Sequence, residues 1–107
     1  MITKLEDRKK LLINKVEVSL PAAVRGYLEF QGLAVVVLER EYSLRNIYAY
    51  TASGELKWII EPVPFQVAPP GYSMVANENG QLLAVAKGTY VVDFNTGEIL
   101  KEIKEYK

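Results

Sequence analysis

The 107-residue sequence predicts an all-β fold in which two antiparallel meanders pack together as a sandwich. Apolar and polar residues alternate with the period of two that is typical of half-buried strands, and turn residues separate the alternating runs. An internal repeat gives the second indication. Residues 46–60 and 89–103 each contain an aromatic-rich strand, a polar turn that ends in Gly-Glu and a second apolar strand. No helical crossover separates the runs, which excludes a parallel βαβ arrangement.

The first dozen residues are the ambiguous part of the chain. Thr3 and Glu6 have the spacing of a helix capping box, so we expect either a short helix or a loose arm here. Residues 15–20 alternate between polar and apolar side chains and predict a half-buried strand. Pro21 ends this strand, because proline cannot donate a hydrogen bond to a neighbouring strand.

The first meander is expected at about residues 24–61. Its predicted strands are residues 24–30, 33–38, 47–50 and 56–60. Gln31-Gly32 predicts a two-residue hairpin turn, and residues 33–38 are apolar on both faces, which is typical of a central strand. The charged residues 39–45 are expected to form a hairpin loop, solvated at its tip, with a polar recognition loop as the alternative.

The second meander is expected at about residues 72–105. Its predicted strands include residues 72–76, 82–86 and 90–94, for a total of eight or nine in the whole chain. Asn79-Gly80 is the strongest hairpin signal in the sequence. The end of the chain, residues 98–107, fits either a strand or a helix, and the match to the first repeat favours a strand.

Residues 62–71 join the two predicted meanders and hold four of the five prolines. Proline restricts the backbone and lacks an N–H group, so this segment is expected to be an extended surface connection. A stiff linker is the favoured interpretation and a partner-binding loop is the alternative. The length fits one domain over residues 1–107.

The composition excludes several classes of chemistry. The chain contains no cysteine and no histidine, which removes thiolate chemistry and the commonest general base and zinc ligand. A metal could bind only through carboxylates and carbonyls, which suits calcium or magnesium, but the carboxylates of a calcium loop are missing near Asn77 and Asn79. We therefore expect no cofactor and no metal. Thirteen basic residues balance thirteen acidic ones, so no nucleic-acid partner is expected. The start of the chain has no signal-peptide pattern and no run is long enough to span a membrane, so we expect a cytoplasmic protein with no membrane partner.

The repeat resembles that of quinoprotein-type β-propellers. The resemblance rests on Ile47-Tyr48-Ala49-Tyr50 with Gly54-Glu55-Leu56-Lys57-Trp58, and on Asp93 with Gly97-Glu98-Ile99 in the second copy. It implies two propeller-blade-like sheets. Two copies cannot close a ring of four to eight blades, and Lys101 stands where the first copy has Trp58, so the cofactor chemistry of that family does not carry over. The same pattern is similar to that of small uncharacterised bacterial proteins.

The candidate ligand-binding residues are aromatic, with one acid. They are Tyr48, Tyr50, Trp58, Tyr72, Tyr90 and Asp93. The aromatic rings would form the walls of a pocket, although in β proteins such residues more often pack across strands in the core. The carboxylate of Asp93 would act as a base or a ligand, although a role in capping a turn is the more usual one. No catalytic residue is predicted.

These observations favour a non-catalytic protein-interaction module whose partner is another protein or a second copy of the chain as a homodimer. The first alternative is a small-ligand binder with an aromatic-lined pocket. The second is a hydrolase that uses carboxylates, which needs at least two acids in one cleft. The absence of histidine, cysteine and nucleotide-binding motifs leads us to prefer the non-catalytic interpretation, without excluding an enzyme.

Overall fold

The computed structural model describes residues 1–64 and 70–103, which form three antiparallel β-sheets and no helix. The N-terminal sheet contains β1 (Ile2–Lys4), β2 (Lys10–Ile13) and β3 (Val16–Ser19). The central sheet contains β4 (Val24–Phe30), β5 (Leu33–Leu38), β6 (Ile47–Tyr50) and β7 (Leu56–Ile59). The C-terminal sheet contains β8 (Met74–Glu78), β9 (Gln81–Val85), β10 (Thr89–Val92) and β11 (Ile99–Ile103). The predicted all-β fold is confirmed.

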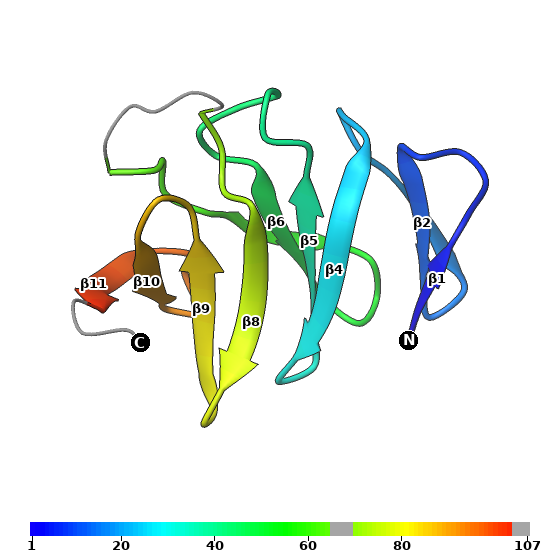
Figure 1. Cartoon of the computed structure of the whole chain (residues 1–107). Helices are drawn as coiled ribbons and strands as arrows, with labels where there is room; N and C mark the ends of the chain where they lie inside the picture. Colours follow the sequence, from blue (N-terminus) through cyan, green and yellow to red (C-terminus); the bar gives the residue numbers. More distant parts are fainter. Residues whose placement is uncertain (65–69, 104–107) are drawn as a thin grey trace.

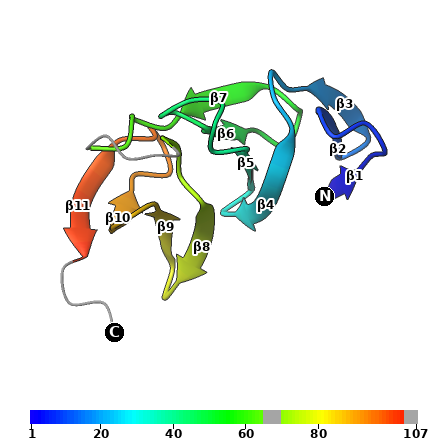
Figure 2. The same cartoon turned by 45° about the horizontal axis from the view of Figure 1, so that its top comes forward.

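The three sheets lie in a row, with the central sheet between the other two (Figures 1 and 2). Every residue of β5 is buried, because both faces of this strand are covered. Leu33, Val35 and Val37 pack toward the C-terminal sheet, and Ala34, Val36 and Leu38 pack toward the N-terminal sheet. Burial of a valine or leucine side chain is worth roughly 1.5–3 kcal/mol, so the two layers on either side of β5 hold the fold together.

The N-terminal sheet corrects the sequence-based expectation of a short helix or a loose arm. Ile2 pairs with Ile13 and Lys4 with Leu11, so the first residues form a strand in an antiparallel sheet. Leu11 and Ile13 are almost completely buried against the central sheet, and this packing outweighs the local helix signal. The described residues thus form eleven strands, and the prediction of eight or nine was wrong.

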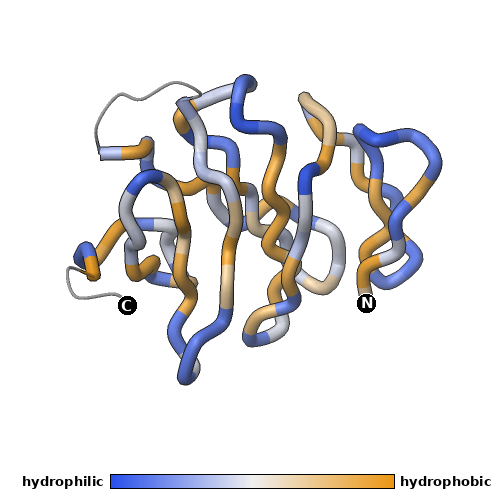
Figure 3. The backbone as a smooth tube through the Cα atoms, in the orientation of Figure 1, coloured by the Kyte–Doolittle hydropathy of each residue, from blue (hydrophilic) through white to orange (hydrophobic). Residues whose placement is uncertain are grey.

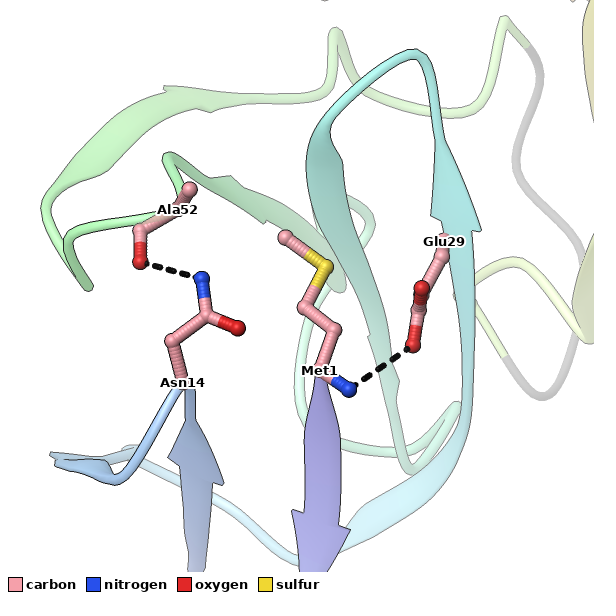
Figure 4. Close-up of polar contacts among 4 residues, drawn as sticks. All are labelled: Met1, Asn14, Glu29 and Ala52. Carbon is pink, nitrogen blue, oxygen red and sulfur yellow. Dashed lines mark hydrogen bonds and ion pairs between the residues drawn. The ribbon is translucent and has the colours of Figure 1, made fainter.

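Polar contacts also join the N-terminal and central sheets (Figure 4). The side-chain amide of Asn14 donates a hydrogen bond of 2.8 Å to the carbonyl oxygen of Ala52. The amino group of Met1 lies 3.5 Å from a carboxylate oxygen of Glu29 on β4. These contacts tie the edge of the N-terminal sheet to a turn and a strand of its neighbour.

The predicted hairpin turns are confirmed by their backbone geometry. Gln31 and Gly32 have φ values of 50° and 80°, and Asn79 and Gly80 have values of 54° and 79°. Positive φ at both central residues defines the type I′ turn, whose twist matches that of paired strands. Figure 3 shows hydrophilic residues at such turns and hydrophobic residues gathered on the strands.

The central and C-terminal sheets have the same strand order, β4-β5-β6-β7 and β8-β9-β10-β11. The register shifts at the same place in both, between Ala49 and Tyr50 in the first and between Val91 and Val92 in the second. The predicted strand at the end of the chain is confirmed over Ile99–Ile103, and the remaining predicted residues, 104–107, lie outside the described residues.

The segment between the two sheets is described only in part, because residues 65–69 lie outside the described residues. Pro62 and Pro64 are exposed, as a surface connection requires, but Val63 between them is buried in the core. The strand predicted at residues 72–76 begins later, at Met74. Tyr72 is not part of the ladder because its backbone N–H donates to the side chain of Asn46.

Candidate functional site

The structure separates the aromatic candidates into two different cores. Tyr48 and Tyr50 lie between the N-terminal and central sheets. Trp58, Tyr72 and Tyr90 lie between the central and C-terminal sheets. The central sheet stands between these two groups, so the five aromatic side chains do not line one pocket.

Burial sets the protonation state of the four candidate tyrosines. Burial, together with a hydrogen bond to Tyr42, raises the pKa of Tyr48 to about 12. Burial also raises the pKa of Tyr50, Tyr72 and Tyr90 above the ordinary value. The hydroxyl of Tyr72 donates a hydrogen bond of 2.8 Å to the carbonyl oxygen of Glu61. All four therefore remain neutral near pH 7.

Trp58 connects the central sheet to the loop between β10 and β11. Its indole N–H donates a hydrogen bond of 2.8 Å to the carbonyl oxygen of Phe94. The backbone of Gly97, in the same loop, packs closely against the indole ring. A Cβ atom at this position would lie only 2.7 Å from Cε3 of Trp58. The structurally equivalent residue of the C-terminal sheet is Lys101, which is exposed. Trp58 is covered by the C-terminal sheet, whereas no described sheet covers Lys101. This difference explains why one position holds a tryptophan and the other a lysine.

Asp93 caps the loop between β10 and β11. Its Oδ1 atom accepts a hydrogen bond of 2.8 Å from the backbone N–H of Asn95, and its carbonyl oxygen accepts one from Gly97. The predicted capping role is thereby confirmed. Thr51 opens the equivalent loop of the central sheet, where its N–H and carbonyl bond to Glu55 and Gly54 in a similar way.

The hollow at the end of the C-terminal sheet is the site that includes Asp93. It has a volume of about 350 Å³ and lies between the turn at Gly80 and the loop that follows β10. Apolar residues form most of its lining, and the others are mainly polar. The lining residues are Gly80, Gln81, Leu82, Val91, Val92, Asp93, Phe94, Asn95 and Leu100.

Two features make this hollow suitable for binding. Leu100 lies at the position where the register shifts, and 60% of its surface is exposed, more than that of any other large apolar residue in the described part of the chain. Oδ1 of Asp93 is held by the loop, whereas no described residue bonds to Oδ2. The hollow thus combines an exposed apolar wall with a fixed, charged acceptor.

The opposite end of the row of sheets is polar. The outward side of the N-terminal sheet carries Thr3, Lys10, Glu17 and Ser19, and Lys10 lies 3.4 Å from the carboxylate of Glu17. Leu12 is the apolar residue on this side and is partly buried. The outward side of the N-terminal sheet therefore exposes less apolar surface than the hollow at the other end.

Sequence reasoning missed one buried polar residue, Asn46. Its side chain is completely buried and forms three hydrogen bonds. Its amide nitrogen donates to the carbonyl oxygens of Leu38 (2.7 Å) and Tyr72 (2.9 Å), and its Oδ1 accepts from the N–H of Tyr72 (2.7 Å). Gly71 packs against it so closely that a Cβ atom there would lie 2.7 Å from Oδ1. No motif marks this residue, because its partners are backbone groups of distant segments.

The arginines of the charged loop also bond to the backbone. Nε of Arg40 donates to the carbonyl oxygen of Gly71, and Nε of Arg45 donates to that of Ile60. These contacts anchor the loop that joins β5 and β6. Among residues 1–64 and 70–103, no group of three or more acidic residues is placed to hold a metal ion.

The fold and the site together define a class: an all-β protein of three stacked antiparallel sheets with a hollow at one end. The chain belongs to the family described as Domain of unknown function (DUF7957), whose model matches residues 1–104. No curated protein and no solved structure matches the sequence. The described residues form no helix that is long and apolar enough to cross a membrane.

Proposed function

We propose that the protein is a non-catalytic interaction module that binds another protein at the hollow of the C-terminal sheet. The observation that carries this proposal is the difference between the two ends of the row of sheets. The outward side of the N-terminal sheet is polar and carries an exposed ion pair, whereas the other end has an apolar hollow of about 350 Å³ beside the exposed Leu100. Exposed apolar surface with a polar rim is typical of interaction sites.

The chemistry of the hollow defines the partner segment that fits it. Val91, Phe94 and Leu100 offer an apolar wall, which suits an aliphatic or aromatic side chain. The carboxylate of Asp93 at the rim suits a lysine or arginine next to that side chain. The volume lies at the low end of the roughly 300–1,000 Å³ that is usual for ligand pockets, so it accommodates one or two side chains.

Substitutions at the wall and at the rim test the proposal. Leu100→Ser is expected to reduce partner recovery about tenfold or more, because it removes the most exposed part of the apolar wall. Leu56→Ser is the matched control, since Leu56 is 50% exposed on β7, away from the hollow. Recovery is measured by affinity capture of the full chain from host lysate, followed by mass spectrometry. Equal recovery with both variants would overturn the proposed site.

Asp93→Asn tests the charge while it preserves the loop. The asparagine oxygen can still accept from the N–H of Asn95, so the cap is retained and only the negative charge is lost. An exposed ion pair is worth up to about 1 kcal/mol, so affinity for the captured partner should fall by up to about fivefold. Calorimetry at low and high salt checks this, and unchanged affinity would remove Asp93 from the site.

Self-association is the second form of the same proposal. A second copy of the chain would bury the same apolar wall on both subunits, since a two-fold interface uses one surface twice. Light scattering over a range of concentrations distinguishes the two forms. A dimer that Leu100→Ser dissociates identifies the partner as a second copy, and a monomer that captures another protein identifies a different one.

We further propose that each four-stranded meander is a propeller-blade-like unit of a cytoplasmic protein of bacterial origin. The shared strand order and the equivalent loops at Gly54 and Gly97, both with positive φ, support the first part. Cell fractionation of the native host tests the location, and recovery of the protein outside the cytoplasm would refute it.

A further inference from the structure

A second hollow lies where β8 meets the central sheet, apart from the proposed protein-binding site. It has a volume of about 190 Å³, and β8 contacts both β4 and β5 here. Val37 of β5 and Val75 of β8 contribute apolar lining, and Gly26 of β4 lies beside them in the lining. The hollow therefore has an apolar wall to which two sheets contribute.

Gly26 leaves this space open because it has no side chain, although the backbone conformation at this position does not require glycine. It does not have a positive φ, and a Cβ atom at this position would meet nothing within 4 Å. Gly26 pairs with Val37, beside a register shift at Arg25. A larger side chain at this position would therefore enter the hollow rather than disturb the strand.

Arg25 brings a positive charge to the same place. Its Nε donates a hydrogen bond of 2.9 Å to the carbonyl oxygen of Ser73, which anchors the guanidinium group across the gap between β4 and β8. No described residue bonds to its two terminal nitrogens. The side chain is thus held by one contact and keeps two N–H-bearing nitrogens for a ligand.

We propose that this hollow binds a short aliphatic carboxylate. The two oxygens of a carboxylate match the terminal nitrogens of Arg25, and charge-assisted pairs of this kind are stronger than neutral hydrogen bonds. The aliphatic part of the ligand packs against Val37 and Val75. The volume is below the roughly 300–1,000 Å³ of sites for larger ligands, which limits the ligand to a few carbon atoms. A free short-chain acid and a glutamate side chain of another protein share this chemistry.

Titration of the ¹⁵N-labelled full chain with sodium butyrate tests the proposal by NMR. Saturable shifts are expected at the amides of Gly26, Ser73 and Val75, with weaker binding of acetate. Butyramide at the same ionic strength has the same shape without the charge and should bind about tenfold or more weakly. Equal shifts with butyrate and butyramide, or shifts that do not saturate, would overturn the proposal.

Two substitutions separate the apolar interior from the charge. Gly26→Val fills the hollow and should abolish the saturable shifts without lowering the melting temperature, since valine favours strands. Arg25→Gln should weaken butyrate binding about tenfold, whereas Arg8→Gln, an exposed arginine of the N-terminal segment, should change it less than twofold. Butyrate binding that survives both Gly26→Val and Arg25→Gln would refute the site.

A blocked glutamate, N-acetylglutamate amide, distinguishes the two sources of the carboxylate. Tighter binding of butyrate assigns the hollow to a free acid, and tighter binding of the blocked glutamate assigns it to a side chain of another protein. Failure of the protein-capture experiments at Leu100 leaves these results unaffected, because the titration uses only the isolated chain.

Discussion

Replacement of Asn46 should be among the most damaging single changes to this fold. Asn46→Ala removes three hydrogen bonds of 2.7–2.9 Å and leaves the N–H of Tyr72 and two carbonyl groups without their partner. Each buried polar group left unpaired costs about 1–3 kcal/mol. Carbonyl oxygens tolerate the loss better than N–H groups do, and a water molecule can enter the vacated space. We therefore expect the free energy of unfolding to fall by about 3–5 kcal/mol.

Urea unfolding followed by tryptophan fluorescence measures this loss. Trp58 is the sole tryptophan and lies between the central and C-terminal sheets, which Asn46 also joins. Asn77→Ala is the matched control, because Asn77 is exposed and accepts one hydrogen bond of 3.3 Å, from the N–H of Gly80. It should cost less than about 1 kcal/mol. A loss below 1 kcal/mol for Asn46→Ala would refute the reasoning that this residue joins the two sheets.

Asn46→Asp adds a test with a defined pH dependence. The substituted carboxylate would face the carbonyl oxygens of Leu38 and Tyr72, which accepted hydrogen bonds from the amide nitrogen. Burial and these oxygens would raise the pKa of the new carboxyl above its unfolded value, near 3.9. The variant should therefore be most stable in acid and lose stability as the pH rises through 4 and above. A stability that is flat between pH 3 and 7 would contradict this.

Two further predictions concern the loop glycines and the buried tyrosines. Gly97→Ala should cost about 2–4 kcal/mol, since φ is 80° and the new methyl would lie 2.7 Å from Trp58; Gly80→Ala, at φ 79° with open space, should cost about 1 kcal/mol in the same urea experiment. Equal losses would show that the ring contact is unimportant. Burial raises the pKa of Tyr48 to about 12 and also raises that of Tyr72, above an unfolded value near 10. The folded state keeps these protons, so stability should be intact below pH 10 and fall as the pH rises through 12. Tyr72→Phe should make this fall less steep, and an unchanged slope would contradict the assignment.

The hairpins of the two four-stranded sheets could be predicted from the sequence because their signals are local. Asn79-Gly80 and Gln31-Gly32 specify their turns through the backbone freedom of a few residues. The valine-rich β5 is apolar on both faces, and this pattern correctly indicated a strand covered on both sides. Asp93 in its loop was likewise recognised, because capping also depends on neighbouring residues.

The parts that escaped prediction depend on contacts between distant segments. In Lys10–Ile13, three consecutive apolar residues follow a lysine, so the sequence lacks the alternation that is typical of a strand. The strand forms because Leu11 and Ile13 pack on the central sheet. The separation of Tyr48 from Tyr90 depends on which face of each sheet is covered, and strand patterns do not contain that information. The hollow beside Arg25 lies next to a register shift in β4 that no sequence motif marks.

The burial of β5 on both sides has a consequence for how the chain folds during synthesis. The N-terminal sheet leaves the ribosome first and has no surface to dock on until the central sheet follows. The central sheet in turn keeps one apolar face exposed until the residues that follow Met74 have emerged and can cover it. A nascent chain of which only residues up to about 64 have emerged would therefore expose Leu33, Val35 and Val37 to solvent, which makes this stage the one at which chaperone binding or aggregation is expected.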